Sequence, residues 1–402
     1  MRREIERAAL DLLDYCRRQA WAGYDPYDAL DSRWLQRPPL RDSRRLRVLV
    51  TQLNKYSPIN LRPMLGIARS RNPKALGLCL AATVQLFRLD LLRSTDPIVE
   101  LVGLIEAGRS AHPNDSWGYS FPWQTRTQLV PKGHPNLVCT VFVANALLDA
   151  NELLGDERCL AMARGAATFI GDELYRTTSA GEPSLAYPLP TSTVPVHNAN
   201  LLGAALLVRM RRHGGSPEAL ERGLGLARHA VSKQHADGSW SYGESSHWRW
   251  VDNFHTGFNL CALNAIARHG ATHEFDAAVA RGCDFYRRHF FLESGAPRYR
   301  TDRTYPIDIH CVAQALITLT DLRHLDASNL GMACRVYRWA AARMLDADGH
   351  FSYQTWPGYT VRIPYMRWAQ AWMLLAMATL LCGLAPTDQH AVMPAEDLVD
   401  VD

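Results

Sequence analysis

One stretch of the sequence, residues 234–269, most constrains what this chain can fold into. It reads QHADGSWSYGESSHWRWVDNFHTGFNLCALNAIARH and joins the end of one helix, an Asp237-Gly238 turn, an aromatic segment and the start of a second helix. The Asp-Gly pair favours a tight turn, and the residues after Asp252 are apolar over more than two helical turns. Weaker copies of this pattern occur along most of the chain. The sequence therefore predicts an array of helical hairpins.

Six segments are apolar nearly all round after a polar or aromatic first turn, as expected for inner helices that pack on every side. Their comparable first-turn residues follow one another at steps of 55 to 62 residues: Lys74, Asn136, Asn198, His255, His310 and Arg367. Between them lie segments with a single apolar stripe, such as residues 274–291 and 328–345. This spacing predicts outer helices with one solvent-exposed face.

The array is predicted to close on itself. An open array would need polar capping repeats at its ends, but the last predicted inner helix is the most apolar of the six. We therefore expect an all-α fold, an (α/α)6 toroid of six helical hairpins, with short extended segments in the loops at one end. The predicted divisions are an N-terminal helix and covering loop over residues 1–42, the toroid catalytic domain over residues 43–385, and a disordered acidic tail over residues 386–402.

Composition excludes several classes of function. Lys and Arg total 44 against 40 Asp and Glu, and this net charge of +4 is too small to predict a nucleic-acid-binding protein. The nine cysteines are scattered through apolar segments and predict buried thiols in a reducing compartment. The N-terminus lacks the apolar stretch of a signal peptide, and the most apolar run, residues 371–385, is shorter than the roughly 20 residues of a membrane span. We expect a cytoplasmic protein without an integral membrane segment, and its oligomeric state stays open.

The repeated outer helix, DGSW-type turn and inner helix resemble the α/α-toroid proteins. These include six-hairpin glycosidases, uronate lyases and sugar epimerases on one side, and terpenoid cyclases and protein prenyltransferases on the other. The likeness covers about residues 43–384 and implies the toroid architecture. The string Gln234-x-x-Asp237-Gly238-Ser239-Trp240 resembles the Gln-Trp repeat of the cyclases, which is a structural motif in that family.

The isoprenoid branch has motifs of its own that can be sought here. Neither the Asp-x-Asp-Asp nor the Asp-Asp-x-x-Asp string occurs in the sequence. Asp308-Ile309-His310-Cys311 resembles part of the zinc site of the protein prenyltransferases, but the next inner helix presents Tyr365 and Arg367, so a third ligand is missing. We predict no metal and no cofactor.

In a closed ring, the N-termini of all six inner helices face the same end of the barrel. Free N–H groups and the helix dipoles make that end suitable for a carboxylate, sulfate or phosphate. We predict His255 and His310 as acid/base residues, with Asp252 and Asp308 orienting them or contributing a carboxylate. The alternative is that Asp252, Asp308 and Asn198 only cap their helices.

The aromatic segment WGYSFPWQTR, residues 117–126, could stack on sugar rings and bind their hydroxyl or carboxylate groups. It could instead be a loop wedge that closes the barrel. Arg126 and Arg367 are predicted to bind an anionic group. The full set of predicted substrate-binding residues is Trp117, Tyr119, Trp123, Gln124, Arg126, Asn136, His197, Asn198, Trp240, Tyr242, Glu244 and Arg367.

Two reaction types fit these residues. Glycoside hydrolysis needs two carboxyl groups beside the bond, and Glu244, Asp252, Asp308 and Asp115 are available. Elimination or epimerisation of a uronate needs a base and groups that stabilise an enolate, which the His and Arg residues fit somewhat better. The sequence therefore favours a carbohydrate-active enzyme that acts on an acidic sugar or oligosaccharide in glycan or polysaccharide assembly or modification. The alternatives are an isoprenoid or lipid-linked-sugar enzyme and a non-catalytic glycan-binding scaffold.

Overall fold

The computed structural model describes residues 1–38, 42–125 and 128–386. Six helices form a closed inner ring in which each contacts the next and the last contacts the first. In order they are α3 (Pro73–Arg88), α5 (Leu137–Leu154), α7 (His197–Arg209), α9 (Asn253–Gly270), α11 (Ile309–Asp321) and α13 (Trp372–Gly383), which follows a π-helical turn, η4 (Met366–Ala371). The predicted closure and all six inner helices are confirmed.

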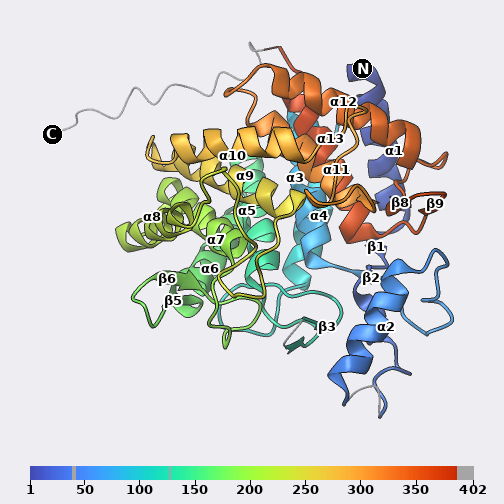
Figure 1. Cartoon of the computed structure of the whole chain (residues 1–402), viewed down its shortest axis with the longest axis horizontal. Helices are drawn as coiled ribbons and strands as arrows, with labels where there is room; N and C mark the ends of the chain where they lie inside the picture. Colours follow the sequence, from blue (N-terminus) through green and yellow to red (C-terminus); the bar gives the residue numbers. More distant parts are fainter. Residues whose placement is uncertain (39–41, 126–127, 387–402) are drawn as a thin grey trace.

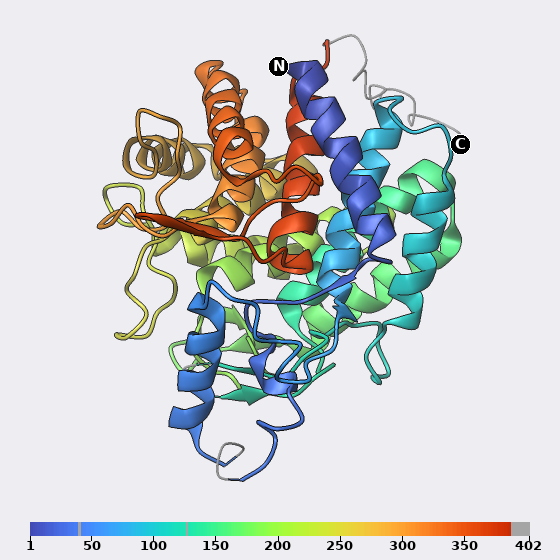
Figure 2. The ribbon, with the colours of Figure 1, turned by 90° about the vertical axis from the view of Figure 1, so that its right-hand side faces the viewer.

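Each inner helix has an outer helix packed against it. The outer helices of the first five pairs are α4 (Asp96–Ala107), α6 (Glu157–Thr168), α8 (Pro217–Ser232), α10 (Asp276–His289) and α12 (Ser328–Met344). The sixth outer position is filled by the N-terminal helix α1 (Arg2–Arg18), which packs on α13 and lies beside it in Figure 2. The predicted boundary at residue 43 separates α1 from the toroid. In the structure, α1 packs on α13 as a member of the outer ring of helices.

A segment between α1 and α3 lies at one end of the barrel (Figures 1 and 2). It contains the strand β1 (Ala22–Gly23), the 3-10 turn η1 (Asp28–Asp31), the helix α2 (Arg44–Tyr56) and the strand β2 (Ser70–Arg71). β1 and β2 pair antiparallel, Ala22 with Arg71 and Gly23 with Ser70. We call residues 22–38 and 42–71 the cap segment.

Short antiparallel strands form the loops at the same end, as predicted. One pair is β3 (Trp123–Gln124) with β4 (Leu129–Val130), and another is β5 (Tyr175–Thr177) with β6 (Pro183–Leu185). The largest sheet has the order β7 (Ile307–Asp308), β8 (Gln354–Trp356) and β9 (Tyr359–Val361). Two single turns, η2 (Phe169–Glu173) and η3 (Met210–His213), extend α6 and α7.

The contacts made by the repeated Asp-Gly turn and its aromatic residues, here Asp237 to Trp240, explain the role of this motif. Gly238 has a φ of +92°, and a Cβ there would lie 2.4 Å from the carbonyl oxygen of Arg281, so the turn requires glycine. The Asp237 carboxylate accepts a hydrogen bond from the Ser239 N–H at 2.9 Å. Trp240 is buried, and its indole N–H donates to the Ala230 carbonyl at the end of α8. This motif therefore joins the outer helix α8 to the loop that leads into the next inner helix, α9.

The core is formed by the facing sides of the two rings. Among the described residues, one helix, α5, is long and apolar enough to cross a membrane, with a mean hydropathy of 1.5. Most of that helix is buried, because it is an inner member of the ring and contacts α3, α6 and α7. Burial between other helices is sufficient to explain its composition.

Candidate active site at the mouth of the barrel

Four basic side chains from the first turns of inner helices lie close enough for their charges to act on one another. They are Lys74 on α3, His255 on α9, His310 on α11 and Arg367 on η4. We call them the basic cluster. Since they come from the starts of four different inner helices, they define one end of the barrel as the mouth. The helix N-termini at this end add positive potential.

Aromatic rings hold the basic cluster together. The Lys74 ammonium lies 4.2 Å from the ring centre of Phe142 and 5.1 Å from that of Trp372. The His310 ring centre is 4.6 Å from that of Trp372 and 4.4 Å from that of Trp368. The Arg367 guanidinium lies 5.2 Å from the Trp368 ring. Neighbouring members of the cluster therefore share a wall of the same aromatic side chains.

Lys74 is buried, and no carboxylate of the described residues forms an ion pair with it. Burial lowers the pKa of its ammonium well below the usual value, and the nearby Arg367 lowers it further. The rings around it offer only cation–π attraction. An anion that reached Lys74 would favour the charged form and would be held by it.

His310 is 2% exposed, and neither of its ring nitrogens has a hydrogen-bond partner among the described residues. Burial lowers its pKa well below 6.5, followed by the charges of Lys74 and Arg367. Asp308 does not orient this ring. Its carboxylate caps α11 through the His310 backbone N–H at 2.9 Å and accepts bonds from Gln354 and Trp368. The predicted Asp308–His310 side-chain pair is therefore absent, and Asp308 acts as a cap.

Asp252 and His255 form a close pair. One oxygen of Asp252 caps α9 by accepting the His255 backbone N–H at 3.0 Å, and the other lies 2.7 Å from Nδ1 of His255. The Trp250 indole N–H donates to that second oxygen at 3.1 Å. A buried carboxylate on Nδ1 fixes the tautomer that keeps Nε2 as an acceptor. The His255 side chain is 21% exposed, in contrast to His310.

Arg367 is not free. Its guanidinium forms two hydrogen bonds, of 2.6 and 2.8 Å, with the two carboxylate oxygens of Asp25 in the cap segment. Both residues are buried, and the Tyr119 ring lies 4.9 Å from the guanidinium. The predicted role of Arg367 as a ready anion-binding group is therefore altered: an internal carboxylate already occupies it. The hollow beside this pair holds about 10 Å³, room for about one water molecule.

Two further contacts lie within the cap segment, and a third joins it to the barrel. Asp28 and the fully buried Arg62 form an ion pair at 2.7 Å. Lys55 donates to the Tyr27 hydroxyl at 2.8 Å. Arg47 donates to Gln124 on β3 at 2.8 Å. Gln124, a predicted substrate-binding residue, therefore holds the cap, and the cap closes the mouth.

Several predicted binding residues pack elsewhere. Trp117 and Trp240 are at most 2% exposed, and their indole nitrogens donate to backbone carbonyls of outer helices, so neither can reach a ligand in this structure. Asn136 caps α5 through the Cys139 N–H at 3.1 Å. Trp123 lies half-buried beside Tyr119, with ring centres 5.8 Å apart. Arg126 lies outside the described residues.

His197 and Asn198 begin α7 and are both buried. The Asn198 side-chain oxygen and Nδ1 of His197 have no partner among the described residues. The His197 backbone N–H donates to the Tyr242 carbonyl, and the Tyr242 ring lies 4.7 Å from that of His255. Tyr242 and His197 therefore connect α7 to the Asp252–His255 pair.

His197 should make stability sensitive to acid. Burial lowers its pKa to about 4, and the charges of His229 and Lys233 act in the same direction. Between about pH 6.5 and 4 the unfolded chain binds a proton at this site that the folded chain does not, so stability falls as the pH falls, by on the order of 3 kcal/mol. We expect His197→Gln to lose less stability between pH 7 and pH 4.5 than the wild type in urea denaturation. The exposed His273→Gln should behave as wild type, and an equal loss in all three proteins would contradict this assignment.

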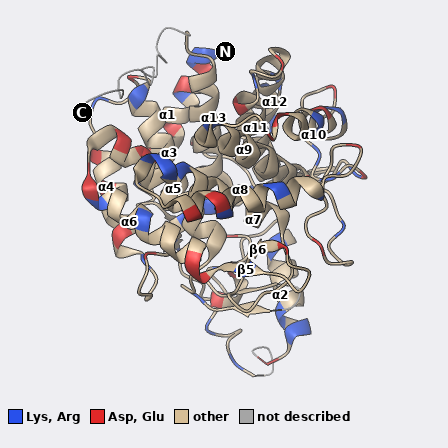
Figure 3. Ribbon diagram, turned by 90° about the vertical axis from the view of Figure 1, so that its left-hand side faces the viewer, with Lys and Arg blue, Asp and Glu red and all other residues tan. Residues whose placement is uncertain are grey.

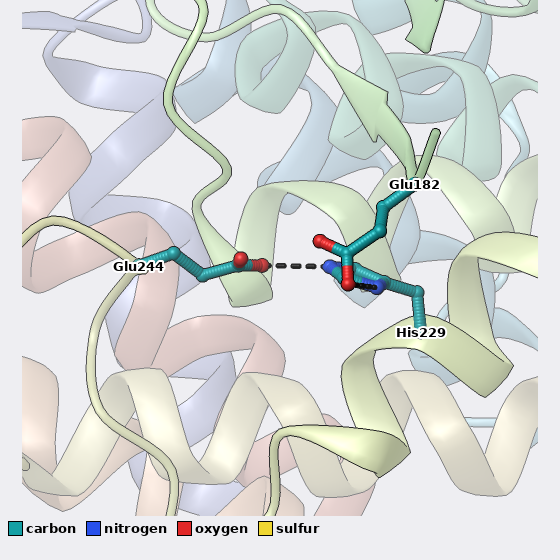
Figure 4. Close-up of side chains that lie close together, drawn as sticks. All are labelled: Glu182, His229 and Glu244. Carbon is teal, nitrogen blue, oxygen red and sulfur yellow. Dashed lines mark hydrogen bonds and ion pairs between the residues drawn. The ribbon is translucent and has the colours of Figure 1, made fainter. Parts of the chain in front are cut away.

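Glu244 belongs to a separate group with His229 and Glu182 (Figure 4). His229 on α8 lies 2.7 Å from Glu244 and 3.8 Å from Glu182. These three side chains could offer three ligand atoms to a metal ion. However, the Lys233 ammonium lies 3.0 Å from Glu182 and 3.9 Å from Glu244. The lysine charge offsets part of the charge of the two carboxylates, so we interpret the group as an ion-pair cluster beside the outer helix α8.

Sequence reasoning missed Asp25 and most of the aromatic wall. The loop that contains Asp25 was expected to cover the barrel. Asp25 pairs with Arg367, which is 342 positions away, and no local sequence pattern connects these two residues. The wall residues Phe142, Phe258 and Trp372 lie within apolar helices, where nothing in the sequence distinguishes a ring that faces the mouth from one that faces another helix.

No known protein family and no curated protein matches the sequence. Solved structures do match the fold. A cellobiose 2-epimerase from Bacillus thermoamylovorans aligns with a TM-score of 0.60 and 12% identity, covering 77% of this chain and 87% of that one. A family 76 α-mannanase from Bacteroides thetaiotaomicron gives 0.59 and 10%, covering 78% and 88%. A D-mannose isomerase gives 0.58 and 11%, covering 77% and 86%. The chain therefore shares the (α/α)6 toroid fold of these proteins.

Proposed function

We propose that this toroid is a carbohydrate-active enzyme that acts on an acidic sugar or oligosaccharide by moving a proton at the carbon next to a carbonyl or carboxylate group. Epimerases, isomerases and lyases perform such steps. The observation that carries the proposal is the Asp252–His255 pair, whose histidine belongs to the basic cluster and is 21% exposed. Support also comes from the fold, which is shared with proteins described as sugar epimerases and isomerases.

In this reaction His255 is the base. Asp252 accepts a hydrogen bond from the Nδ1–H of His255, so the lone pair on Nε2 is available to remove a proton from the sugar carbon. Negative charge then develops on the adjacent oxygen atoms. His310, whose two ring nitrogens have no partner among the described residues, can donate its one N–H to that oxygen, and the developing anion favours the charged form of Lys74.

Hydrolysis by two carboxyl groups is less well supported. Asp252 and Asp308 cap helices and accept bonds from side chains, and Glu244 pairs with His229. Asp115 pairs with Arg109 at 2.9 Å. Since each of these carboxylates already has a partner, no pair stands ready on either side of a glycosidic bond.

The anionic character of the ligand is proposed from the basic cluster. Lys74 has no counter-ion among the described residues, and the Arg367 site already accommodates one carboxylate, that of Asp25. A ligand carboxylate that replaced Asp25 would reproduce the same two hydrogen bonds. Binding would then require the cap segment to move, because Asp25 and the mouth are buried together.

The aromatic wall favours a second candidate, an enzyme that handles an isoprenoid or lipid-linked sugar. Phe142, Phe258, Trp368 and Trp372 offer apolar faces around the basic cluster. Such faces bind prenyl chains as readily as sugar rings.

A thermal-shift screen separates these candidates. Wild-type protein and His255→Ala, His310→Ala and His273→Ala variants would be tested with uronic acids, acidic oligosaccharides, neutral sugars and prenyl phosphates. A ligand at about 100 times its Kd stabilises the folded state by about 2.7 kcal/mol. We expect acidic sugars to stabilise the wild type and His273→Ala, and to stabilise His255→Ala and His310→Ala less. Stabilisation by prenyl phosphates alone would favour the second candidate, and no shift with any of these ligands would contradict both candidates.

A further inference from the structure

The helix α2 in the cap segment presents its apolar side to solvent. Leu49, Leu53 and Tyr56 follow one another at helical spacing and are 52%, 63% and 41% exposed. The buried residues of α2 are Thr51, Asn54 and Lys55, which lie on the opposite side. This orientation is the reverse of that expected for a surface helix of a globular protein, in which the apolar stripe faces the core.

Exposed apolar side chains are concentrated in the cap segment. Of the thirteen large hydrophobic side chains exposed among the described residues, six lie between positions 34 and 64: Trp34, Leu49, Leu53, Tyr56, Ile59 and Met64. We call these six the outer face of the cap. It continues onto the β8–β9 hairpin, because the Tyr56 ring is 6.0 Å from that of Trp356, which stacks on the exposed Tyr359. Such a concentration indicates a docking surface rather than scattered surface residues.

The same segment carries a strong positive charge. Residues 22–71 contain ten Lys and Arg residues and four Asp residues, a net charge of +6, whereas the whole chain carries +4. Arg33, Arg37 and Arg45 are exposed, and the first two lie over the Trp34 ring at 5.2 and 5.1 Å. Figure 3 shows α2 projecting from the molecule with basic segments in its ribbon.

We propose that the outer face of the cap docks on an anionic lipid surface. An amphipathic helix with leucine and aromatic side chains on one side and arginines beside them inserts its apolar side among lipid headgroups, while the arginines bind anionic headgroups. The net charge of +6 over residues 22–71 selects an anionic surface over a neutral one. Since the inner side of this segment holds Asp25 against Arg367, docking places the mouth of the barrel beside the lipid.

The test is sedimentation of the full-length protein with lipid vesicles. Neutral phosphatidylcholine vesicles would be compared with vesicles that contain phosphatidylglycerol, at low and at high salt. The variant Leu49→Glu/Leu53→Glu removes the apolar stripe of α2. The matched control is Val99→Glu/Leu325→Glu, because Val99 and Leu325 are 51% and 39% exposed but lie outside the cap. Circular dichroism and thermal melting establish that each variant is folded.

We expect the wild type and the control variant to bind anionic vesicles at least roughly tenfold better than neutral ones, with binding weakened by salt, and Leu49→Glu/Leu53→Glu to stay in solution. Equal binding by this variant, or no preference for anionic vesicles, would overturn the proposal. Light scattering tests a second copy of the chain as the occupant: a dimer that becomes a monomer in Leu49→Glu/Leu53→Glu, without vesicle binding by the wild type, would also overturn it. These outcomes do not depend on the proposed sugar chemistry.

Discussion

Replacement of His255 by Asn is expected to lower turnover of the acidic substrate by about 10²- to 10⁴-fold, the usual contribution of a general base. The expectation follows from the 2.7 Å contact between Asp252 and Nδ1 of His255, which leaves Nε2 as the nitrogen of the ring that can accept a proton. Asp252→Asn should also be slow, because an Asn that caps α9 with its oxygen places its NH2 group at the position of the second carboxylate oxygen, where it cannot accept from Trp250 or from Nδ1 of His255. Asparagine remains a good helix cap, so α9 should stay folded.

The matched control for these variants is His273→Asn, which changes an exposed histidine on the outer surface. It should retain full activity. Turnover would be measured at several pH values, since loss of the base removes its limb of the pH profile, whereas a general loss of structure lowers all points together. Wild-type turnover in both His255→Asn and Asp252→Asn would exclude this pair as the base.

Removal of the Asp25 carboxylate, as in Asp25→Ala, is expected to lower the free energy of unfolding by about 3–5 kcal/mol, because it leaves Arg367 buried without its counter-ion. Both side chains are about 5% exposed, and two hydrogen bonds join them. The effect would be measured by urea denaturation. Asp25→Leu combined with Arg367→Met should cost much less than the sum of the single changes, because it replaces the pair with apolar groups.

The control for Asp25 comes from the same segment. Asp31 pairs with the exposed Lys132 at 3.0 Å, and Asp31→Ala should cost no more than about 1 kcal/mol. If Asp25→Ala costs as little as Asp31→Ala, the Asp25–Arg367 pair does not hold the cap on the barrel.

The inner helices were predictable because each is buried on all sides, and burial imposes an apolar composition that the sequence displays directly. Their first turns were predictable for a similar reason, since Asp252 and Asp308 have the chemistry of helix caps and serve as such. The ring closure followed from the apolar last helix. The position of α1 in the outer ring could not be predicted, because an amphipathic helix has the same sequence pattern whether it belongs to the ring or precedes it.

The candidate site was less predictable. The sequence identified His255 and its carboxylate, which are three residues apart, but paired His310 with Asp308 on the same reasoning, and the ring of His310 instead packs among aromatic side chains. Trp117 and Trp240 were predicted to bind the substrate, although the same aromatic pattern also suits a wedge between helices. The reversed orientation of α2 could not be known until its neighbours were in place, since periodicity reveals an apolar side but not the direction in which it points.

The most direct test of the proposed chemistry is the exchange of a carbon-bound hydrogen of the sugar with solvent deuterium. The acidic sugar that stabilises the protein most would be incubated with wild type, His255→Asn and His273→Asn in D₂O and followed by proton NMR. We predict that wild type and His273→Asn place deuterium at the carbon next to the carbonyl or carboxylate group of the substrate or its product, and that His255→Asn does so about 10²- to 10⁴-fold more slowly. Conversion of the sugar with full retention of that hydrogen, or exchange at an undiminished rate in His255→Asn, would contradict the account.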